Sequence, residues 1–114
     1  MPETYAPGVI YSIRAGEDLP KARFVGFDGN LCAANAKALG VTQYDFAAGE
    51  MAGVIVNGIA LVEAGGAIST GQAVASGADG KAVALTDSAT QKRNGWALDD
   101  ATAAGQVIRV LLAA

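Results

Sequence analysis

Histidine is absent from the 114-residue chain, which removes the commonest general base, the Ser-His and Cys-His dyads and the usual zinc ligand. The one cysteine, Cys32, excludes an internal disulfide, and its apolar neighbours predict a buried small side chain. Aromatic residues make up only 6% of the chain and alanine dominates its apolar residues, so we expect a thin core. A domain built in this way should gain stability by associating with a partner.

Strong charge and long apolar runs are also missing. Eleven acidic residues against eight basic ones give a net charge of -3, which provides no overall attraction to nucleic acid or to anionic lipid. No apolar run is long enough to span a membrane, and the opening "MPETYAPG" lacks the basic and apolar regions of a signal peptide. We therefore expect a single domain that is made and kept in a cytosol and binds neither nucleic acid nor membrane.

What the chain does contain is a repeated order of segments. Residues 15–34, "AGEDLPKARFVGFDGNLCAA", and residues 64–85, "AGGAISTGQAVASGADGKAVAL", share an Ala-Gly start, an apolar run, an Asp-Gly pair and a second apolar run. Residues 39–56 and 94–112 then share an Ala-Ala-Gly segment followed by a strand-like apolar run. The pattern predicts an internal duplication, with a few residues inserted in the second copy, which we place in its polar segment "TDSATQKRN".

The turns and apolar runs predict a β-rich fold. Asp28-Gly29 and Asp79-Gly80 should form two hairpin tips, because glycine takes positive φ freely and aspartate tolerates it. Asn57-Gly58 fits either a further hairpin turn or a glycine bulge within one long strand. Helix is scarce, since no segment carries a long amphipathic stripe. The expected fold is mainly β, a small β-barrel or β-sandwich with an internal duplication and little helix, whose halves share one core.

Groups that could carry chemistry are few. The acidic candidates are the adjacent pairs Glu17-Asp18 and Asp99-Asp100. Adjacent strand residues point to opposite faces, so we expect solvated carboxylates and no dyad that shares a proton. Residues 66–73, "GAISTGQA", have the glycine spacing of a phosphate-binding loop but lack its lysine and its hydroxyl. The chain is therefore expected not to be an enzyme and to bind no cofactor, metal or nucleotide.

The run "VNGIALVEAGGAISTGQAVASGADGKAVAL", followed by "NGWALDDATAAGQVIRVLLA", resembles a family of tailed-phage capsid decoration, or cement, proteins that was formerly a domain of unknown function. The resemblance covers residues 8–112, and it rests on the order of the motifs more than on any single one. It implies a structural virion protein that is made in the host cytoplasm, binds the outer surface of a phage head and stabilises the shell of major capsid protein. The acidic, histidine-free composition agrees with this role.

Two other classes of protein stay open. Lys81 beside a hairpin tip resembles the modified lysine of lipoyl and biotinyl carrier domains, although the neighbours of that lysine differ from the carrier pattern; a solvated edge residue is the alternative. A carbohydrate-binding or host-surface-binding module would need an exposed aromatic platform, for which Tyr5, Tyr44 and Trp96 are the candidates.

The amino-terminal residues are expected to form a flexible arm at 1–7, followed by a single β-rich decoration domain at 8–114. Pro2 and Pro7 remove backbone donors, so the arm should not belong to the central sheet. Tyr5 and Pro7 are the candidate contacts to the capsid or to a neighbouring subunit. For the oligomer we expect a homotrimer first and a dimer second, because three-fold positions are abundant on an icosahedral shell.

Overall fold

A computed structural model describes residues 6–112 as eight strands and one short 3-10 turn, so the prediction of a mainly β fold with little helix is confirmed. The elements are β1 (Ala6–Arg14), β2 (Phe24–Val25), β3 (Gly40–Thr42), β4 (Met51–Glu63), β5 (Ala73–Ser76), the 3-10 turn Ala78–Gly80, β6 (Ala82–Ala84), β7 (Gly95–Ala97) and β8 (Val107–Leu112).

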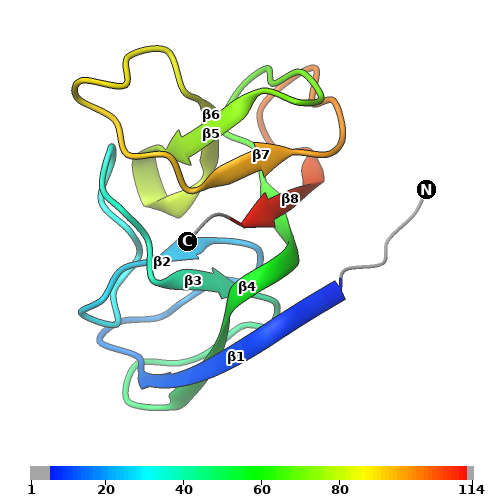
Figure 1. The fold of residues 1–114 in the computed structure, drawn as a ribbon. Helices are drawn as coiled ribbons and strands as arrows, with labels where there is room; N and C mark the ends of the chain where they lie inside the picture. The colour runs from blue at the N-terminus through cyan, green and yellow to red at the C-terminus, as the bar shows by residue number, and fades with distance from the viewer. Residues whose placement is uncertain (1–5, 113–114) are drawn as a thin grey trace.

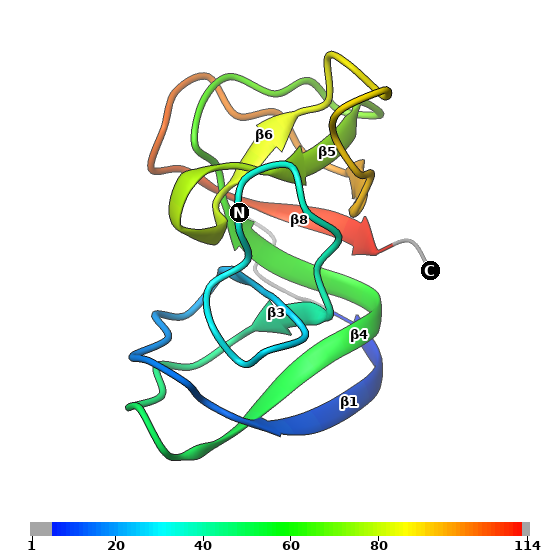
Figure 2. The ribbon, with the colours of Figure 1, turned by 90° about the vertical axis from the view of Figure 1, so that its left-hand side faces the viewer.

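The strands form one antiparallel sheet that curls into a nearly closed barrel. Its order is β2-β3-β4-β8-β7-β5-β6, and β1 pairs with β4 outside this path. Figure 1 shows β1, β2 and β3 in the lower part of the molecule and β5, β6 and β7 in the upper part, with β4 passing between them. A bridge from Ala64, just after β4, to Ala82 in β6 ties the far end of the sheet back to its centre. The view in Figure 2 shows the same two parts stacked along the path of β4.

The internal duplication is visible in the hydrogen bonds of the loops. Leu19 and Phe46 exchange backbone N–H···O=C bonds in the first half (residues 6–58), and Ile68 and Ala101 do the same in the second half (residues 59–112). Two further hydrogen bonds recur at matched positions. Gly49 N–H donates to Ala15 O in the first half, and Gly105 N–H donates to Ala64 O in the second. Likewise, Lys21 N–H donates to the Asp45 carboxylate, and Thr70 N–H donates to the Asp100 carboxylate. The two halves are therefore copies of one β unit.

The two copies differ in length at a hairpin. Val25 pairs with Leu31, six positions along the chain, whereas its counterpart Val74 pairs with Ala84, ten positions along. Four inserted residues therefore lie in the β5–β6 hairpin of the second half. We expected the inserted residues in the polar segment "TDSATQKRN", which follows β6. For these four residues that prediction was wrong, because the β5–β6 hairpin is longer than its counterpart in the first half.

Both Asp-Gly pairs lie at hairpin tips, as predicted, but the two turns are different. At the second tip Asp79 and Gly80 both have positive φ, 58° and 73°, which is the pattern of a type I′ turn. At the first tip only Gly29 does, with φ 85°, and Gly26 N–H donates to Asn30 O to close the loop. Both Asp-Gly pairs therefore reverse the chain at a hairpin tip, but with different backbone geometry.

Asn57-Gly58 lies inside the long strand β4, which settles the choice between a turn and a bulge. The register of β1 against β4 shifts between Pro7 and Val9 and again between Val9 and Ile10, opposite this pair. Gly58 has φ 102°, a value that side-chain-bearing residues rarely adopt. Beyond the bulge β4 exchanges its pairing with β3 for pairing with β8, so one strand ends the first half and begins the second.

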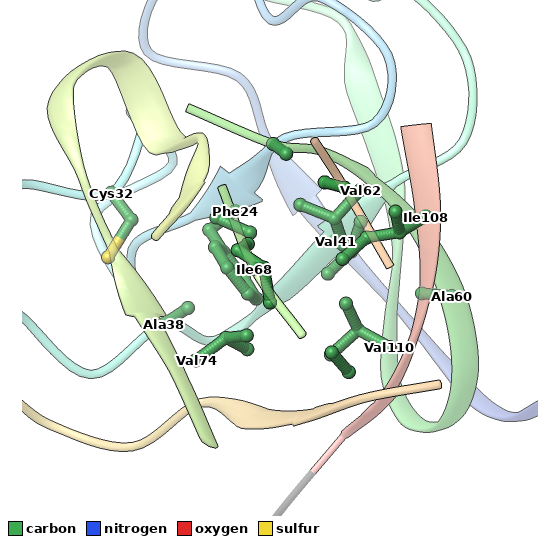
Figure 3. Close-up of a cluster of buried hydrophobic side chains, with 14 of the residues drawn as sticks. Phe24, Cys32, Ala38, Val41, Ala60, Val62, Ile68, Val74, Ile108 and Val110 are labelled. Atoms are coloured by element: carbon green, nitrogen blue, oxygen red, sulfur yellow. The ribbon is translucent and has the colours of Figure 1, made fainter. Parts of the chain in front are cut away.

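The core consists of two clusters where we expected one. The main cluster takes residues from both halves, and Figure 3 shows Phe24, Val62, Val74, Ile108 and Val110 around a shared interior. The second cluster lies within the first half; its buried members are Ala15, Leu19, Val25, Ala52 and Val54. Alanine contributes ten of the 22 buried apolar residues, so the prediction of a thin core holds for the described part of the chain.

Two polar clamps join the halves around the main cluster. The buried Asn94 side chain accepts a bond from Ala38 N–H at 3.0 Å and donates to Ala36 O at 3.1 Å, which fixes the loop before β3. Arg23 donates to Glu63 Oε1 at 3.3 Å and to Asp79 O at 3.1 Å. Each clamp uses a group of one half to satisfy polar atoms of the other, so neither half is complete alone.

Strand β1 begins at Ala6, two residues before the boundary expected between arm and domain. Pro7 lies opposite Gly58, next to the register shift, and thus at an edge strand, where a missing N–H can be tolerated. Tyr5 and the rest of residues 1–5 lie outside the described part of the chain, so the expectation of a flexible arm there stays a prediction.

Candidate functional site

The acidic pair in the first half supports loops. Glu17 Oε2 accepts a bond from Leu31 N–H at 2.9 Å, and Asp18 Oδ1 accepts one from Ala48 N–H at 3.0 Å. The two carboxylates thus point to different loops and share no proton. They are not merely solvated, as the sequence suggested, because each satisfies a backbone donor of a connecting segment.

The acidic pair in the second half is also structural. Asp99 receives two bonds from the Arg109 guanidinium, at 2.9 and 2.7 Å, and a third from the Arg109 backbone N–H at 2.9 Å. These bonds lower the pKa of Asp99 below its usual value, and bonds from Thr70 lower the pKa of Asp100. A general acid needs a raised pKa, so neither carboxyl is suited to that task.

Asp99→Asn should lower the free energy of unfolding by about 1 kcal/mol at pH 7, after allowance for the solvent that screens a partly exposed pair. The folded pKa of Asp99 is below the reference value of 3.8, so its contribution is fully present above that pH. The contribution is lost as the pH falls through the lower folded pKa. Urea unfolding of the wild type and the variant, repeated from pH 7 into acid, should therefore give a difference that shrinks toward zero. Thr102→Ala, which changes a neutral side chain, should give a difference that does not vary with pH; equal pH dependence in both variants would contradict the assignment.

The glycine-spaced loop at residues 66–73 uses its polar groups internally. Gln72 Oε1 accepts a bond from Ser69 N–H at 3.1 Å, and Thr70 is held by Asp100. Lys81, the candidate carrier lysine, lies 3.6 Å from Glu63 Oε2 and shares that carboxylate with Arg23. The loop does not present a phosphate cradle, and the lysine is part of the clamp between the halves.

Cys32 is buried, as predicted, and burial raises the pKa of its thiol. The protonated form is a weak nucleophile, so this cysteine is a packing residue of the main cluster. Within residues 6–112, His, Cys, Asp and Glu side chains do not gather in groups of three that could hold a metal ion. The same residues contain no helix with the length and apolar character of a membrane span.

Apolar side chains are exposed on β1. Val9, Ile10 and Tyr11 are consecutive, so they point alternately to opposite faces of the strand, yet each is more than half exposed. In the described part of the chain, β1 pairs only with β4, which leaves its outer edge open. We call this stretch, residues 9–12, the open strand; long apolar edges of this kind are protected by a partner in most native proteins.

A second apolar surface lies on the outside of the second half. Ala73 in β5, Trp96 in β7 and Leu111 in β8 are cross-strand neighbours and form a continuous row, which we call the outer row. Leu111 is 42% exposed, and the Arg93 guanidinium lies 4.7 Å from the centre of the Trp96 ring. Trp and Arg in such a setting are typical of protein interfaces. Tyr44 is exposed on a loop of the first half, so Trp96 and Tyr44 belong to different halves.

These features define a small, nearly all-β domain with apolar side chains exposed on both of its halves. A family model described as "Phage cement protein" matches residues 5–112, and the chain belongs to this family. It is therefore a structural protein of the phage virion, with a capsid-binding role, and the resemblance seen in the sequence is confirmed. No curated protein matches the chain.

A solved structure supports the same fold. The chain is similar to the head fiber gp8.5 N base of bacteriophage phi29, with a TM-score of 0.74 over 92% of this chain and 93% of that one. The two sequences are 24% identical, so this likeness concerns the fold. The open strand and the outer row were missed by sequence reasoning. The only signal for the former is the run "GVIYSI", which lacks a charge before Arg14.

Proposed function

We propose that this protein binds the outer surface of a phage head and holds neighbouring subunits of the major capsid protein together against the pressure of packaged DNA. The match to the cement family over residues 5–112 is the observation that carries the proposal. The protein is a passive clamp in this role, without enzymatic activity, cofactor or metal.

The physical character of the surface supports this role. The net charge of -3 suits an outer location better than one facing DNA, because a protein lining the packaged genome would be repelled by its phosphates. The open strand and the outer row offer apolar area for partners. The acidic side chains discussed above are occupied in loops and are not arranged for catalysis.

A homotrimer is the oligomer that fits this role best, with a dimer second. Icosahedral shells offer many local three-fold positions, where a three-fold oligomer can match the symmetry of its host. A thin core in which nearly half of the buried apolar residues are alanine also gains stability from subunit contacts.

The test of the function is decoration of heads that lack the protein. Purified protein should co-sediment with such heads until a fixed number of sites is filled, and decorated heads should withstand a higher temperature before they release their DNA. Heads that neither bind the protein nor gain heat resistance would overturn the proposal.

Tyr5 and Pro7 are proposed to contact the capsid or a neighbouring subunit. Because Ala6 and Pro7 belong to β1, the informative deletion removes residues 2–5 only. It should leave thermal unfolding unchanged and weaken head binding about tenfold or more, since Tyr5 is the only large side chain that it removes. Tyr5→Ala should reproduce part of that loss in the same co-sedimentation assay, and Thr4→Ala is the matched control. Unchanged affinity of the deletion variant would place the contacts on the barrel.

A further inference from the structure

In residues 6–112, the two halves use different surfaces to contact each other. Phe24, Val41 and Ile55 form a cross-strand row on the first half, and all three are buried in the main cluster against the second half. The matching row on the second half is the outer row, Ala73, Trp96 and Leu111, in which Leu111 is 42% exposed and Ala73 and Trp96 are partly buried. The first half thus uses this face as an internal interface, and the second half leaves the same face partly exposed.

The complementary side shows the same asymmetry. At the start of the second half, Ala60 is fully buried and its neighbour Ile59 is half-buried. Their counterparts at the start of the first half are Tyr11 and Ile10, which are 55% and 60% exposed. The pairing registers with β8 and with β4 establish these counterparts. The surface that the second half has covered is therefore uncovered on the first half.

The backbone groups at the strand edges show the same difference between the halves. The Gln43 side-chain amide binds both the N–H and the carbonyl of Leu61 on the outer edge of β4, at 3.1 and 3.0 Å. The counterpart of Leu61 is Ser12, on the open strand, and the counterpart of Gln43 is Leu98, next to the outer row. The edge of β4 at Leu61 is therefore capped by a side chain of the same protein, and the equivalent edge of β1 at Ser12 is open.

We propose that a second copy of this chain places its outer row and Leu98 on the open strand, and so repeats between chains the contact that joins the two halves within one chain. The occupant is a second copy because, in the part of the chain that the structure describes, the covered example of this edge is covered by the sister unit of the same fold. The contact is head-to-tail, and a head-to-tail contact gives a ring when the rotation between neighbours closes; closure after three chains would form a ring of six related halves.

The composition of the two surfaces suits such a contact. Leu98 replaces the amide of Gln43, which makes the proposed intermolecular surface more apolar than the intramolecular one. The outer row also brings Trp96 with its stacked Arg93, and both residue types are common among those that dominate binding energy. The open strand supplies Tyr11 opposite them. The proposal deepens the proposed trimer by naming its interface.

Charge placed on either surface should break the oligomer. Tyr11→Lys and Leu111→Lys should each shift the mass measured by light scattering from trimer to monomer, because the interface then buries an unpaired ammonium group. Phe27→Lys and Tyr44→Lys are matched controls, since these side chains are 67% and 65% exposed on loops outside both surfaces. The controls should remain trimeric, and thermal unfolding will show whether all four variants are folded.

Trp96 is the only tryptophan and reports directly on the outer row. Its fluorescence should shift to longer wavelength when the wild type is diluted below the association range, and this concentration dependence should vanish in Tyr11→Lys. A wild type that stays monomeric at high concentration would overturn the inference. Co-sedimentation with heads is measured separately, so a monomer that still decorates heads would leave the proposed function standing.

Cross-linking tests the head-to-tail arrangement. In a Cys32→Ala background, a chain with both Ser12→Cys and Leu98→Cys should oxidise to a covalent trimer on a non-reducing gel, whereas each single variant should not cross-link. Cross-linked dimers of Ser12→Cys alone would show that open strands pair with each other and would overturn the proposed contact. The proposed contact would also be overturned if, in decorated heads, the cysteine at position 12 cross-linked to a shell protein and no two copies of this chain cross-linked to each other.

Discussion

Phe24→Ala should lower the free energy of unfolding by about 3–5 kcal/mol, the usual cost of removing a fully buried aromatic ring. Phe24 is completely buried and is the only aromatic residue among the buried apolar residues of the described chain. It lies on β2 in the first half yet packs in the main cluster with Ile68 and Val74 of the second half, as Figure 3 shows. The cavity would open at the contact between the halves, where few large side chains are available to fill it.

The measurement is urea unfolding at 25 °C, read by circular dichroism, with Phe27→Ala as the matched control. Phe27 is a neighbour on the first hairpin turn and is exposed, so its removal should change stability by less than about 0.5 kcal/mol. The free energy of unfolding of native domains is only about 5–15 kcal/mol in total, so the Phe24→Ala variant should be only marginally stable. A loss below about 1 kcal/mol would mean that Phe24 does not hold the halves together.

Gly95→Ala should cost about 3 kcal/mol, at the upper end of the range for overpacked interiors. A Cβ at Gly95 would collide with the carbonyl oxygen of Leu111 and would lie 2.7 Å from Val110 Cγ1, and backbone atoms cannot rotate away. The counterpart in the first half, Gly40, has the same problem, with Ile55 O at 2.5 Å. Glycine is therefore required at the same point of both copies because the next strand passes too closely for a side chain.

The thermal midpoint and urea unfolding of Gly95→Ala and Gly40→Ala should both fall, by amounts of similar size. Gly66→Ala is the control, because a Cβ there meets no atom within 4 Å and the residue does not have positive φ. That variant should be as stable as the wild type or slightly more stable, since alanine loses less backbone entropy on folding. If Gly66→Ala and Gly95→Ala behaved alike, general glycine effects would explain the result and close packing would not.

Much of the fold could be predicted because its signals are local. Asp79-Gly80 specifies a tight turn within a few residues, and the apolar runs around it alternate with period two. The order of segments revealed the duplication, and the order of motifs revealed the family, because both are properties of the linear chain. The mainly β fold followed from these signals together.

The parts that were missed depend on contacts between residues far apart in sequence. Nothing near Phe24 in the chain indicates that its ring belongs to the core of the other half, since that depends on how two similar units stack. For the same reason, the division into two clusters was missed. The position of the insertion was misjudged because a polar segment suggests a loop, while added length in a hairpin leaves no compositional trace.

The candidate site shows the same limit. The absence of histidine directed attention away from catalysis, but it could not identify which apolar side chains face outward. Ile10 and Ile59 occupy matched positions and are the same residue type, yet one is exposed and the other half-buried. Their difference comes from the neighbour that each half has or lacks, and only the structure reveals it.

The sharing of β4 by both halves has a mechanical consequence. Met51 to Val56 complete one unit, and Ile59 to Glu63 begin the next, so one continuous strand, with the Asn57-Gly58 bulge at its middle, joins the copies. A force that pulls the ends of the molecule apart would have to shear whole ladders of antiparallel hydrogen bonds at once, instead of straightening a flexible connection. Duplication through a common strand therefore resists separation of the two units, although alanine makes up ten of the 22 buried apolar residues.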